Sequence, residues 1–324
     1  MAELDFSVVI CAYTEDRWAD LTAAVASVQA QTRPARELIV VIDHNPRLCE
    51  RARAAFPAVT ILENHQARGL SGARNTGLAA ASGAVVAFMD EDAVAAADWL
   101  AELAAGYARP EVLGVGGAIE PQWETGRPAW FPAEFDWVVG CTYRGLPTTA
   151  APVRNLIGCN MSVRREVFGE VGGFRDGVGR IGTTPVGCEE TELCIRARQH
   201  WPGRPFLYIP QARVHHRVPA VRAQWRYFQA RCWSEGRSKA LVAQLVGAQD
   251  ALGTERAYTF KTLPAGVWRG LRDLVLGREL AGLQRAAAIA AGLALTALGY
   301  LSGRLAGAPS RRPVVPQAGT VHSA

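Results

Sequence analysis

The chain has 324 residues, which is long enough for one large domain or for two, with a substantial core. Hydrophobic residues make up 49% and charged residues 20% of the chain, a balance that excludes an intrinsically disordered protein. The net charge of +5 is uneven: between Arg213 and Arg285 there are 13 lysines and arginines against 5 aspartates and glutamates, so the rest of the chain is net negative.

Strands and helices alternate through the first ninety residues. The apolar runs that predict buried strands cover residues 6–11, 37–42, 59–63 and 84–90. The runs that predict helices cover residues 16–31, 48–55 and 69–81. This alternation predicts an α/β fold with a mostly parallel, doubly wound sheet.

The middle of the chain continues the sheet but contains one unusual segment. Helices are predicted at residues 99–107, 165–171 and 189–199, and strands at 112–119, 159–164, 206–209 and 212–215. Residues 122–149 are rich in aromatic side chains and prolines, and loops of this length are usually functional or mobile. Within it, Trp130, Phe131 and Trp137 could stack on a ligand ring or pack beneath the loop, and packing is the favoured interpretation.

The character of the chain changes to helical after Pro219. Residues 222–246 predict a long basic and aromatic helix, and residues 267–283 predict an amphipathic one. Residues 286–303 form an apolar run about 27 Å long as a helix, close to the thickness of a membrane. About half of that run is alanine and glycine, so a buried, a surface-lying and a spanning helix all remain open. The basic helices beside it favour membrane association.

Three regions are therefore expected. Residues 1–220 would form the catalytic domain, residues 221–308 a helical region that associates with a membrane, and residues 309–324 a disordered tail. The seven cysteines form no CxxC pair, which predicts free thiols in a reducing compartment. No signal peptide is expected at the N-terminus, so the catalytic domain should face the cytoplasm.

Three carboxylates follow the strand predicted at residues 84–90. Asp90, Glu91 and Asp92 would lie at the carboxyl edge of the sheet, where ligands of α/β folds usually bind. Charges at the end of a buried strand are costly unless they are solvated, paired or bound to a cation. Hard carboxylate oxygens beside a phosphate suit Mg²⁺ or Mn²⁺. The alternative is a solvated acidic turn before a helix.

Further polar residues are predicted at the same edge of the sheet. Asp43 follows the second strand and could accept hydrogen bonds from a base or a ribose, while Tyr13 after the first strand offers a stacking face. Each could equally be a turn-former or an edge aromatic. In the glycine-rich stretch Gly69–Gly77, the helix N-terminus favours anions and Arg74 adds a planar donor for phosphate. The stretch is neither a dinucleotide fingerprint nor a P-loop.

Two more groups could contribute chemistry. Glu189 and Glu190 begin a predicted helix, where carboxylates fit the helix dipole. Adjoining carboxylates repel, which raises the pKa of one member of such a pair toward the range of a general base. His215 and His216 end the last predicted strand, and a histidine there could complete a metal site or serve a structural purpose.

Taken together, these motifs resemble family 2 glycosyltransferases of the GT-A fold, over roughly residues 5–240. The match rests on Cys11–Thr14, Asp43, Gly69–Gly77, the Asp90–Asp92 version of the Asp-x-Asp motif, Gly158–Met161, the Glu189–Glu190 pair and His216. The aromatic segment and residues 218–239 are similar to the branch of glucosyl-dolichyl-phosphate glucuronosyltransferases.

The resemblance implies a nucleotide-sugar donor, usually a UDP-sugar, and an inverting displacement at the anomeric carbon. By position, Asp90 would face the ribose, and Asp92 with His216 would hold Mg²⁺ or Mn²⁺ on the diphosphate. The family's base pair is commonly Glu-Asp, whose second position falls here on Glu190, so either Glu190 or Glu189 would act. The remaining nucleotide-sugar-binding residues would be Ala12, Tyr13, Glu15, Asp43, Ser71, Arg74 and Glu91.

The expected protein is thus a metal-dependent inverting glycosyltransferase with a polyprenyl-linked or other envelope glycan acceptor and no nucleic-acid partner. It would act at the cytoplasmic face of the cell membrane, held peripherally or by a single C-terminal helix, or else in the cytoplasm. One alternative is a nucleotidyltransferase, which would normally place a lysine on the phosphates, and no lysine precedes Lys239. Another is a non-catalytic nucleotide-sugar-binding protein associated with the membrane.

Overall fold

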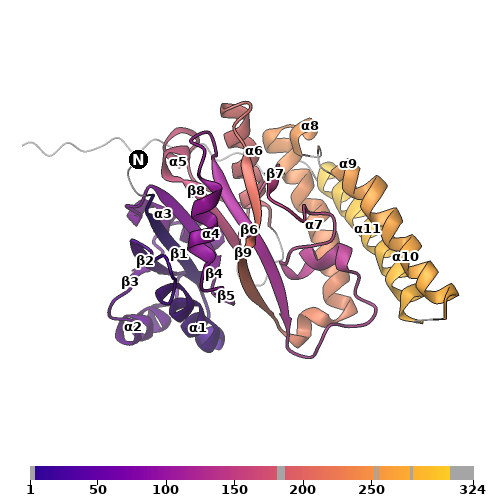
Figure 1. Ribbon diagram of the computed structural model, residues 1–324, viewed down its shortest axis with the longest axis horizontal. Coiled ribbons are helices and arrows are strands. Elements are labelled where there is room, and N and C mark those ends of the chain that lie inside the picture. Colours follow the sequence, from indigo (N-terminus) through magenta and orange to yellow (C-terminus); the bar gives the residue numbers. More distant parts are fainter. Residues whose placement is uncertain (1–3, 181–186, 252, 254, 278–279, 307–324) are drawn as a thin grey trace, which may run out of the picture.

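The four strands predicted in the first ninety residues lie side by side and parallel (Figure 1). Their spatial order is β3 (Thr60–Glu63), β2 (Glu37–Ile42), β1 (Phe6–Ala12) and β4 (Val85–Asp90). The computed structural model describes residues 4–180, 187–251, 253, 255–277 and 280–306, so the tail expected from residue 309 lies outside the described residues.

Beyond β4 the sheet is mixed. Strand β8 (Asn160–Arg164) runs antiparallel to β4 and to β6 (Gly114–Trp123), and β9 (Phe206–Val218) runs parallel to β6. Two short strands, β5 (Ala93–Ala95) and β7 (Ala151–Val153), pair antiparallel with β9. The α/β prediction is confirmed, and the parallel arrangement covers the part from β3 to β4. In this topology the carboxyl ends of β1, β2, β4 and β9 share one edge of the sheet.

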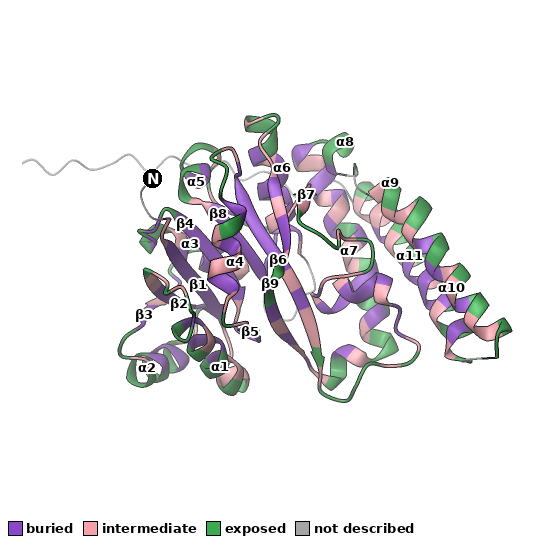
Figure 2. Cartoon of the chain, viewed as in Figure 1, coloured by how far each residue is buried: buried purple, intermediate pink, exposed green. Residues whose placement is uncertain are grey.

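Helices cover both faces of the sheet because side chains alternate along each strand. In β1, Val8 and Ile10 join the core on one face, while Val9 and Cys11 join the core on the other. The first face is covered by α1 (Trp18–Gln29), α2 (Pro46–Ala55) and α4 (Trp99–Gly106). The second is covered by α3 (Leu70–Ala80), α5 (Arg165–Val171) and α6 (Glu189–His200). Figure 2 shows the strands buried between these layers.

The two last predicted strands are in fact one. Strand β9 runs continuously past Pro210, and its register against β6 shifts between Gly117 and Ala118, so the extra residues form a bulge. A proline interrupts a strand pattern in the sequence but is tolerated at such a bulge. The sequence analysis missed β5 and β7 because three-residue strands carry no periodic signal of their own.

The aromatic segment at residues 122–149 is largely packed. It begins with the end of β6 and contains the helical turn η2 (Ala133–Val139). Phe131 and Phe135 are buried and contact Phe228, which lies on the following helical region, and Trp130 also contacts Phe228. Trp130 and Phe131 therefore pack, as the sequence analysis favoured, and join the catalytic domain to the C-terminal helices.

Those C-terminal helices form a layer beside the sheet (Figure 1). Their order is η3 (Ala220–Ala223), α7 (Trp225–Val246), α8 (Ala248–Ala251), α9 (Glu255–Ala257), the π-helical turn η4 (Tyr258–Thr262), α10 (Leu263–Val275) and α11 (Ala281–Leu305). The single helix predicted at residues 267–283 is wrong. Gly277 has φ +65°, a left-handed conformation that ends a helix readily, so α10 and α11 form a hairpin.

Close backbone contact holds α11 against α7. A Cβ added to Gly236 would lie 2.1 Å from the carbonyl oxygen of Thr296, and one added to Gly299 would lie 2.2 Å from the carbonyl oxygen of Trp233. Glycines at these positions let the two helices approach as small residues do in tightly packed helix pairs. Helix α11 is long and apolar enough to cross a membrane, and 28% of its most apolar 18-residue window is buried inside the protein.

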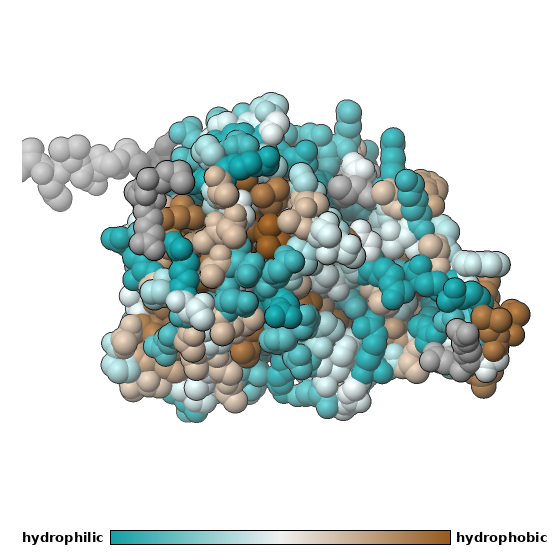
Figure 3. Space-filling view, in the orientation of Figure 1, coloured by the Kyte–Doolittle hydropathy of each residue, from teal (hydrophilic) through white to brown (hydrophobic). Residues whose placement is uncertain are grey.

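The hairpin leaves large apolar side chains exposed. On α10 these are Trp268, Leu271 and Val275, spaced so that they share one helix face. Leu276 and Leu280 extend this surface at the tip of the hairpin, where Figure 3 shows a hydrophobic patch. The apolar face predicted from the amphipathic pattern therefore exists, but it points away from the protein core.

Gly299→Ala tests the contact between α7 and α11. The added methyl group collides with the Trp233 carbonyl, and we expect a loss of about 1–3 kcal/mol in the free energy of unfolding, measured with urea. Gly169→Ala is the matched control, because Gly169 lies in α5 with open space around it and helical alanine is favoured by up to about 1 kcal/mol. Equal effects of the two substitutions would contradict the packing described here.

Candidate active site

A cavity of about 1060 Å³ opens at the edge where β1, β2, β4 and β9 end. On the sheet side it is lined by Ala12, Tyr13, Asp43 and Asp90, which all stand at or just after the ends of strands. On the other side it is lined by residues of η2, α7, η4 and α11. The C-terminal helices thus complete the cavity rather than lying apart from it.

Asp43 organises the loop before α3. One carboxylate oxygen accepts hydrogen bonds from Asn64 Nδ2 at 2.6 Å and from His44 Nδ1 at 2.8 Å. The other accepts the backbone N–H of Gly69 at 3.0 Å. Gly69, with φ +122°, precedes the first turn of α3 and lines the cavity. Asp43 is therefore both a wall of the cavity and the anchor of the glycine-rich stretch.

Arg74 connects the acidic turn with the glutamate pair. Its side chain is buried, and its Nη1 lies 2.8 Å from Glu189 Oε1 while its Nη2 lies 3.4 Å from Asp90 Oδ1. The guanidinium also lies over the rings of Phe88 and Phe174. These contacts hold the end of β4 and the start of α6 in a fixed relation.

Asp92 is the most heavily paired acid of the turn. Its Oδ1 lies 3.2 Å from His216 Nε2, and its Oδ2 lies 3.2 Å from Arg17 and 3.3 Å from Arg222. Burial alone would raise the pKa of Asp92, but these three cationic partners hold it well below its usual range. Burial would likewise lower the pKa of His216, but the charge and hydrogen bond of Asp92 raise it to about 10.

Glu91 differs from its neighbours. It is buried and bonded to Arg17 Nη1 at 2.6 Å, yet burial and the charge of Asp92 raise its pKa above the ordinary value. Arg17 comes from η1 (Glu15–Arg17) and thus ties the first loop to the acidic turn. The turn is not a solvated surface feature, because Glu91 and Asp92 are buried and paired.

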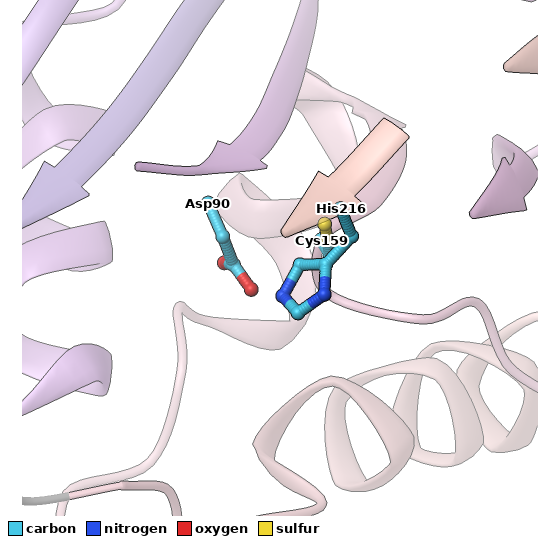
Figure 4. Close-up of side chains that lie close together, drawn as sticks. All are labelled: Asp90, Cys159 and His216. Atoms are coloured by element: carbon cyan, nitrogen blue, oxygen red, sulfur yellow. The ribbon is translucent and has the colours of Figure 1, made fainter. Parts of the chain in front are cut away.

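A cluster of three metal-type ligands lies next to this turn. One carboxylate oxygen of Asp90, a ring nitrogen of His216 and Sγ of Cys159 lie within 4.8 Å of one another (Figure 4). The sequence analysis assigned the cation to Asp92 with His216 and the ribose to Asp90; in the structure the cluster joins His216 with Asp90 and Cys159, while Asp92 is hydrogen-bonded to His216. Burial raises the pKa of the Cys159 thiol well above its ordinary value, so the oxygen and nitrogen atoms are the better donors for a hard cation.

The glutamate pair lies at the start of α6. Glu189 is buried and held by Arg74, and its second oxygen has no hydrogen-bond partner among the described residues. Glu190 is half-buried and lines the cavity. Burial and the neighbouring Glu189 raise the pKa of Glu190 to about 8, although Arg74 opposes the shift. The two acids thus have different environments.

A cluster of basic residues in the cavity was not foreseen. Arg180, Arg222 and Arg231 line the cavity around Tyr227. Burial alone would raise the pKa of Tyr227, but the three arginines lower it. The sequence analysis did not assign a role to these arginines. The spacing of Arg222, Tyr227 and Arg231 along one helical region was the available signal.

Two predicted residues lie elsewhere. Glu15 and Ser71 are not among the described residues that line the cavity. Glu15 is near Arg47 on the outer side of the first loop. Ser71 is buried, and its hydroxyl donates a hydrogen bond to the backbone carbonyl of Val178. Ser71 therefore fixes the loop before α6 instead of facing the cavity.

The fold and this cavity define a class of enzyme. A sheet of this order, with cavity-lining residues after β1 and β2 and an acidic turn after β4, is the GT-A arrangement. Two solved glycosyltransferases share the fold. PcManGT, a mannosyltransferase from Pyrobaculum calidifontis in complex with GDP-Man and Mn²⁺, superposes with a TM-score of 0.58 at 18% identity, over 91% of this chain and 86% of that one.

The second solved structure is GalNAc-T7 with UDP, GalNAc and Mn²⁺, which has a TM-score of 0.52 and 20% identity. The match covers 80% of this chain, which spans 56% of the length of GalNAc-T7. At these identities the comparison establishes the fold alone.

Sequence comparison gives the family. Residues 7–172 match the family described as Glycosyl transferase family 2. The glucosyl-dolichyl phosphate glucuronosyltransferase of Haloferax volcanii is 35% identical over 303 residues, which are 92% of this chain and 96% of that protein. The succinoglycan biosynthesis protein ExoM of Rhizobium meliloti is 24% identical over 262 residues, 79% of each chain.

The chain belongs to glycosyl transferase family 2. It is a glycosyltransferase, and its resemblance to the glucosyl-dolichyl phosphate glucuronosyltransferase branch is confirmed. The nucleotidyltransferase and non-catalytic alternatives lose their support.

Arg74→Met tests the buried ion pair. The substitution leaves the Glu189 carboxylate buried without its cation, so we expect a loss of about 3–5 kcal/mol in the free energy of unfolding, measured with urea. The double variant Arg74→Met/Glu189→Gln removes the uncompensated charge and should recover part of this loss. A single variant as stable as the wild type would disprove the structural importance of the pair.

Proposed function

We propose that this chain transfers a sugar from a UDP-sugar to a hydroxyl group of a lipid-linked glycan, with inversion at the anomeric carbon. The observation that carries the proposal is the placement of Glu190 in one cavity with Asp90, Arg74 and His216. A base and a site for a diphosphate are thereby held on different loops of the same sheet edge. Inverting transfer needs these two features, because the acceptor attacks from the side opposite the leaving group.

The nucleotide would bind beside Ala12, Tyr13 and Asp43. Tyr13 offers a ring for stacking, and Asp43 lies where base or ribose groups can donate to it. Arg180, Arg222 and Arg231 bring positive charge to the same cavity, as the charge of two phosphates requires. The GT-A enzymes that share this fold were solved with UDP or GDP-Man, which supports a nucleotide-sugar donor.

A divalent cation, Mg²⁺ or Mn²⁺, fits the donor set next to the diphosphate position. Asp90 would supply an oxygen ligand, and His216 would supply a nitrogen ligand by releasing the proton that it holds beside Asp92, which orients the ring through its hydrogen bond. The cation would offset the negative charge that develops on the departing nucleoside diphosphate. Both solved relatives contained Mn²⁺.

Glu190 is assigned as the general base, and Glu189 as the residue that positions it. Glu189 accepts a hydrogen bond from Arg74, and this ion pair makes it the poorer candidate for the general base. The raised pKa of Glu190 suits a group that must accept a proton from the acceptor hydroxyl. This follows the family pattern, in which the second acid of the pair acts.

The C-terminal helices and one relative support the proposed acceptor and location. The Haloferax volcanii relative is named for a dolichyl phosphate substrate. We assign residues 1–220 to catalysis and residues 221–308 to membrane association on the cytoplasmic face. Because α11 is packed tightly against α7, whose residues include Arg231, Glu235 and Lys239, a peripheral position is favoured over a spanning one.

Glu190→Gln should lower kcat by roughly 10²–10⁴-fold while UDP binding stays unchanged, because the amide cannot accept the proton. Transfer from UDP-glucuronic acid to a glucosyl phosphate lipid and calorimetric UDP binding measure the two effects. Glu189→Gln is the comparison variant, and it should also lower thermal stability because Arg74 loses its partner. Wild-type turnover by Glu190→Gln would refute the assignment.

The pH profile provides a second test of the base. Only the deprotonated carboxylate can accept a proton, so kcat/KM should fall about tenfold per pH unit below the pKa of Glu190, which is about 8, and level off above it. A profile that stays flat down to pH 6 would show that another group acts.

Trp268→Glu/Val275→Glu tests the membrane surface. Flotation with vesicles of phosphatidylcholine and phosphatidylglycerol should show at least about tenfold weaker binding, because two exposed apolar side chains are replaced by charges. Val94→Glu/Val221→Glu is the matched control, since both valines are exposed but lie outside the hairpin. Equal binding of both double variants would exclude this surface.

A further inference from the structure

Part of the lining of this cavity is apolar and comes from segments outside the sheet. We define the apolar arm by its lining residues Trp137, Tyr258, Leu293, Ala297 and Leu301. Trp137 comes from η2, Tyr258 from η4, and the other three from α11. All five residues therefore come from the aromatic segment or from the C-terminal helices.

The walls of the apolar arm offer few polar groups to a ligand. Trp137 Nε1 donates to the hydroxyl of Tyr258 at 2.9 Å, and that hydroxyl donates to the carbonyl oxygen of Glu134 at 2.6 Å. The polar atoms of both aromatic side chains are thus bonded to each other and to the backbone. The five residues that define the arm therefore offer mainly ring and aliphatic carbon, a surface for hydrocarbon rather than for a sugar, whose hydroxyls need partners.

The arm also reaches the outer surface. Leu293 and Leu301 line the cavity, and they are 37% and 57% exposed. They belong to α11, which forms one side of the hairpin that carries the exposed apolar face. The arm therefore opens toward solvent along α11, one of the two helices of the hairpin.

Charged side chains line the same cavity as the apolar arm. Lys239 and Arg154 line the cavity and both pair with Glu255, at 2.8 Å and 3.3 Å. Lys239 also lies 3.8 Å from Glu235, so two carboxylates balance the two cations and the group is a charged boundary to the apolar arm.

We propose that the apolar arm holds the hydrocarbon chain of the lipid-linked acceptor, which enters from the membrane between α11 and η4. The inference rests on the proposed function, and it adds a binding site that selects the acceptor by chain length. Each methylene group that leaves water contributes about 0.8 kcal/mol at most, so an isoprenoid chain supplies much of the acceptor affinity.

Leu301→Asp and Ala297→Trp test the arm, the first by placing a charge at its mouth and the second by filling it. Leu298→Asp and Leu305→Asp are matched controls on the same helix, since both leucines are exposed and neither is among the described residues that line the cavity. The acceptors are glucosyl phosphates with a C20 or a C5 isoprenoid chain, assayed in detergent so that membrane binding does not limit the rate.

The wild type should prefer the C20 acceptor by at least about tenfold in kcat/KM, through KM. Leu301→Asp and Ala297→Trp should remove most of this preference while transfer to the C5 acceptor is unchanged, and the controls should keep it. Equal use of both acceptors by the wild type, or equal effects of test and control variants, would overturn the proposal.

Binding of geranylgeranyl phosphate, which carries no sugar, separates this inference from the proposed function. If the wild type transfers to neither acceptor, the proposed acceptor class is wrong. The arm is still supported if geranylgeranyl phosphate binds the wild type and the controls but binds Leu301→Asp and Ala297→Trp at least about fivefold more weakly. Absence of binding to the wild type, or equal binding to all variants, refutes the arm.

Discussion

A buried guanidinium group must be neutralised by acidic partners. The ion pairs that neutralise Arg74 fix the geometry of the active site. Its two acidic partners, Glu189 and Asp90, come from segments about a hundred residues apart. Gly158 lies against it so closely that a Cβ there would be 2.5 Å from Nη2. Because one rigid, planar cation serves both acids, the end of β4 and the start of α6 cannot move independently. The distance between the proposed diphosphate and base positions follows from this constraint.

The second constraint is the contact of α7 with α11. Gly236 and Gly299 allow two backbones to approach so closely that α11 becomes a wall of the cavity. The cavity therefore has acidic residues from the sheet edge, basic residues from η3 and α7, and apolar residues from η2, η4 and α11. An enzyme that joins a charged donor to a lipid-linked acceptor needs both kinds of surface at one site.

Much of the catalytic domain could be predicted from local sequence. The strands of the parallel half are apolar runs with clear breaks, and Asp43, Asp90 and Asp92 stand where such strands end. Errors arose where local signals mislead: Pro210 hid the continuity of β9, and an apolar pattern across Gly277 hid the turn between α10 and α11. In both places the backbone conformation depends on a neighbouring strand or helix.

The sequence by itself determined the family, the acidic turn and the glutamate pair, because strand ends and short motifs are encoded by adjacent residues. Tertiary structure alone decided the partners of these acids: Arg17 and Arg222 meet at Asp92 from distant segments, while Ser71 turns away from the cavity. It also decided that the C-terminal helices form part of the active site. Charges and cavities depend on three-dimensional distances, and these arise only when segments far apart in sequence pack together.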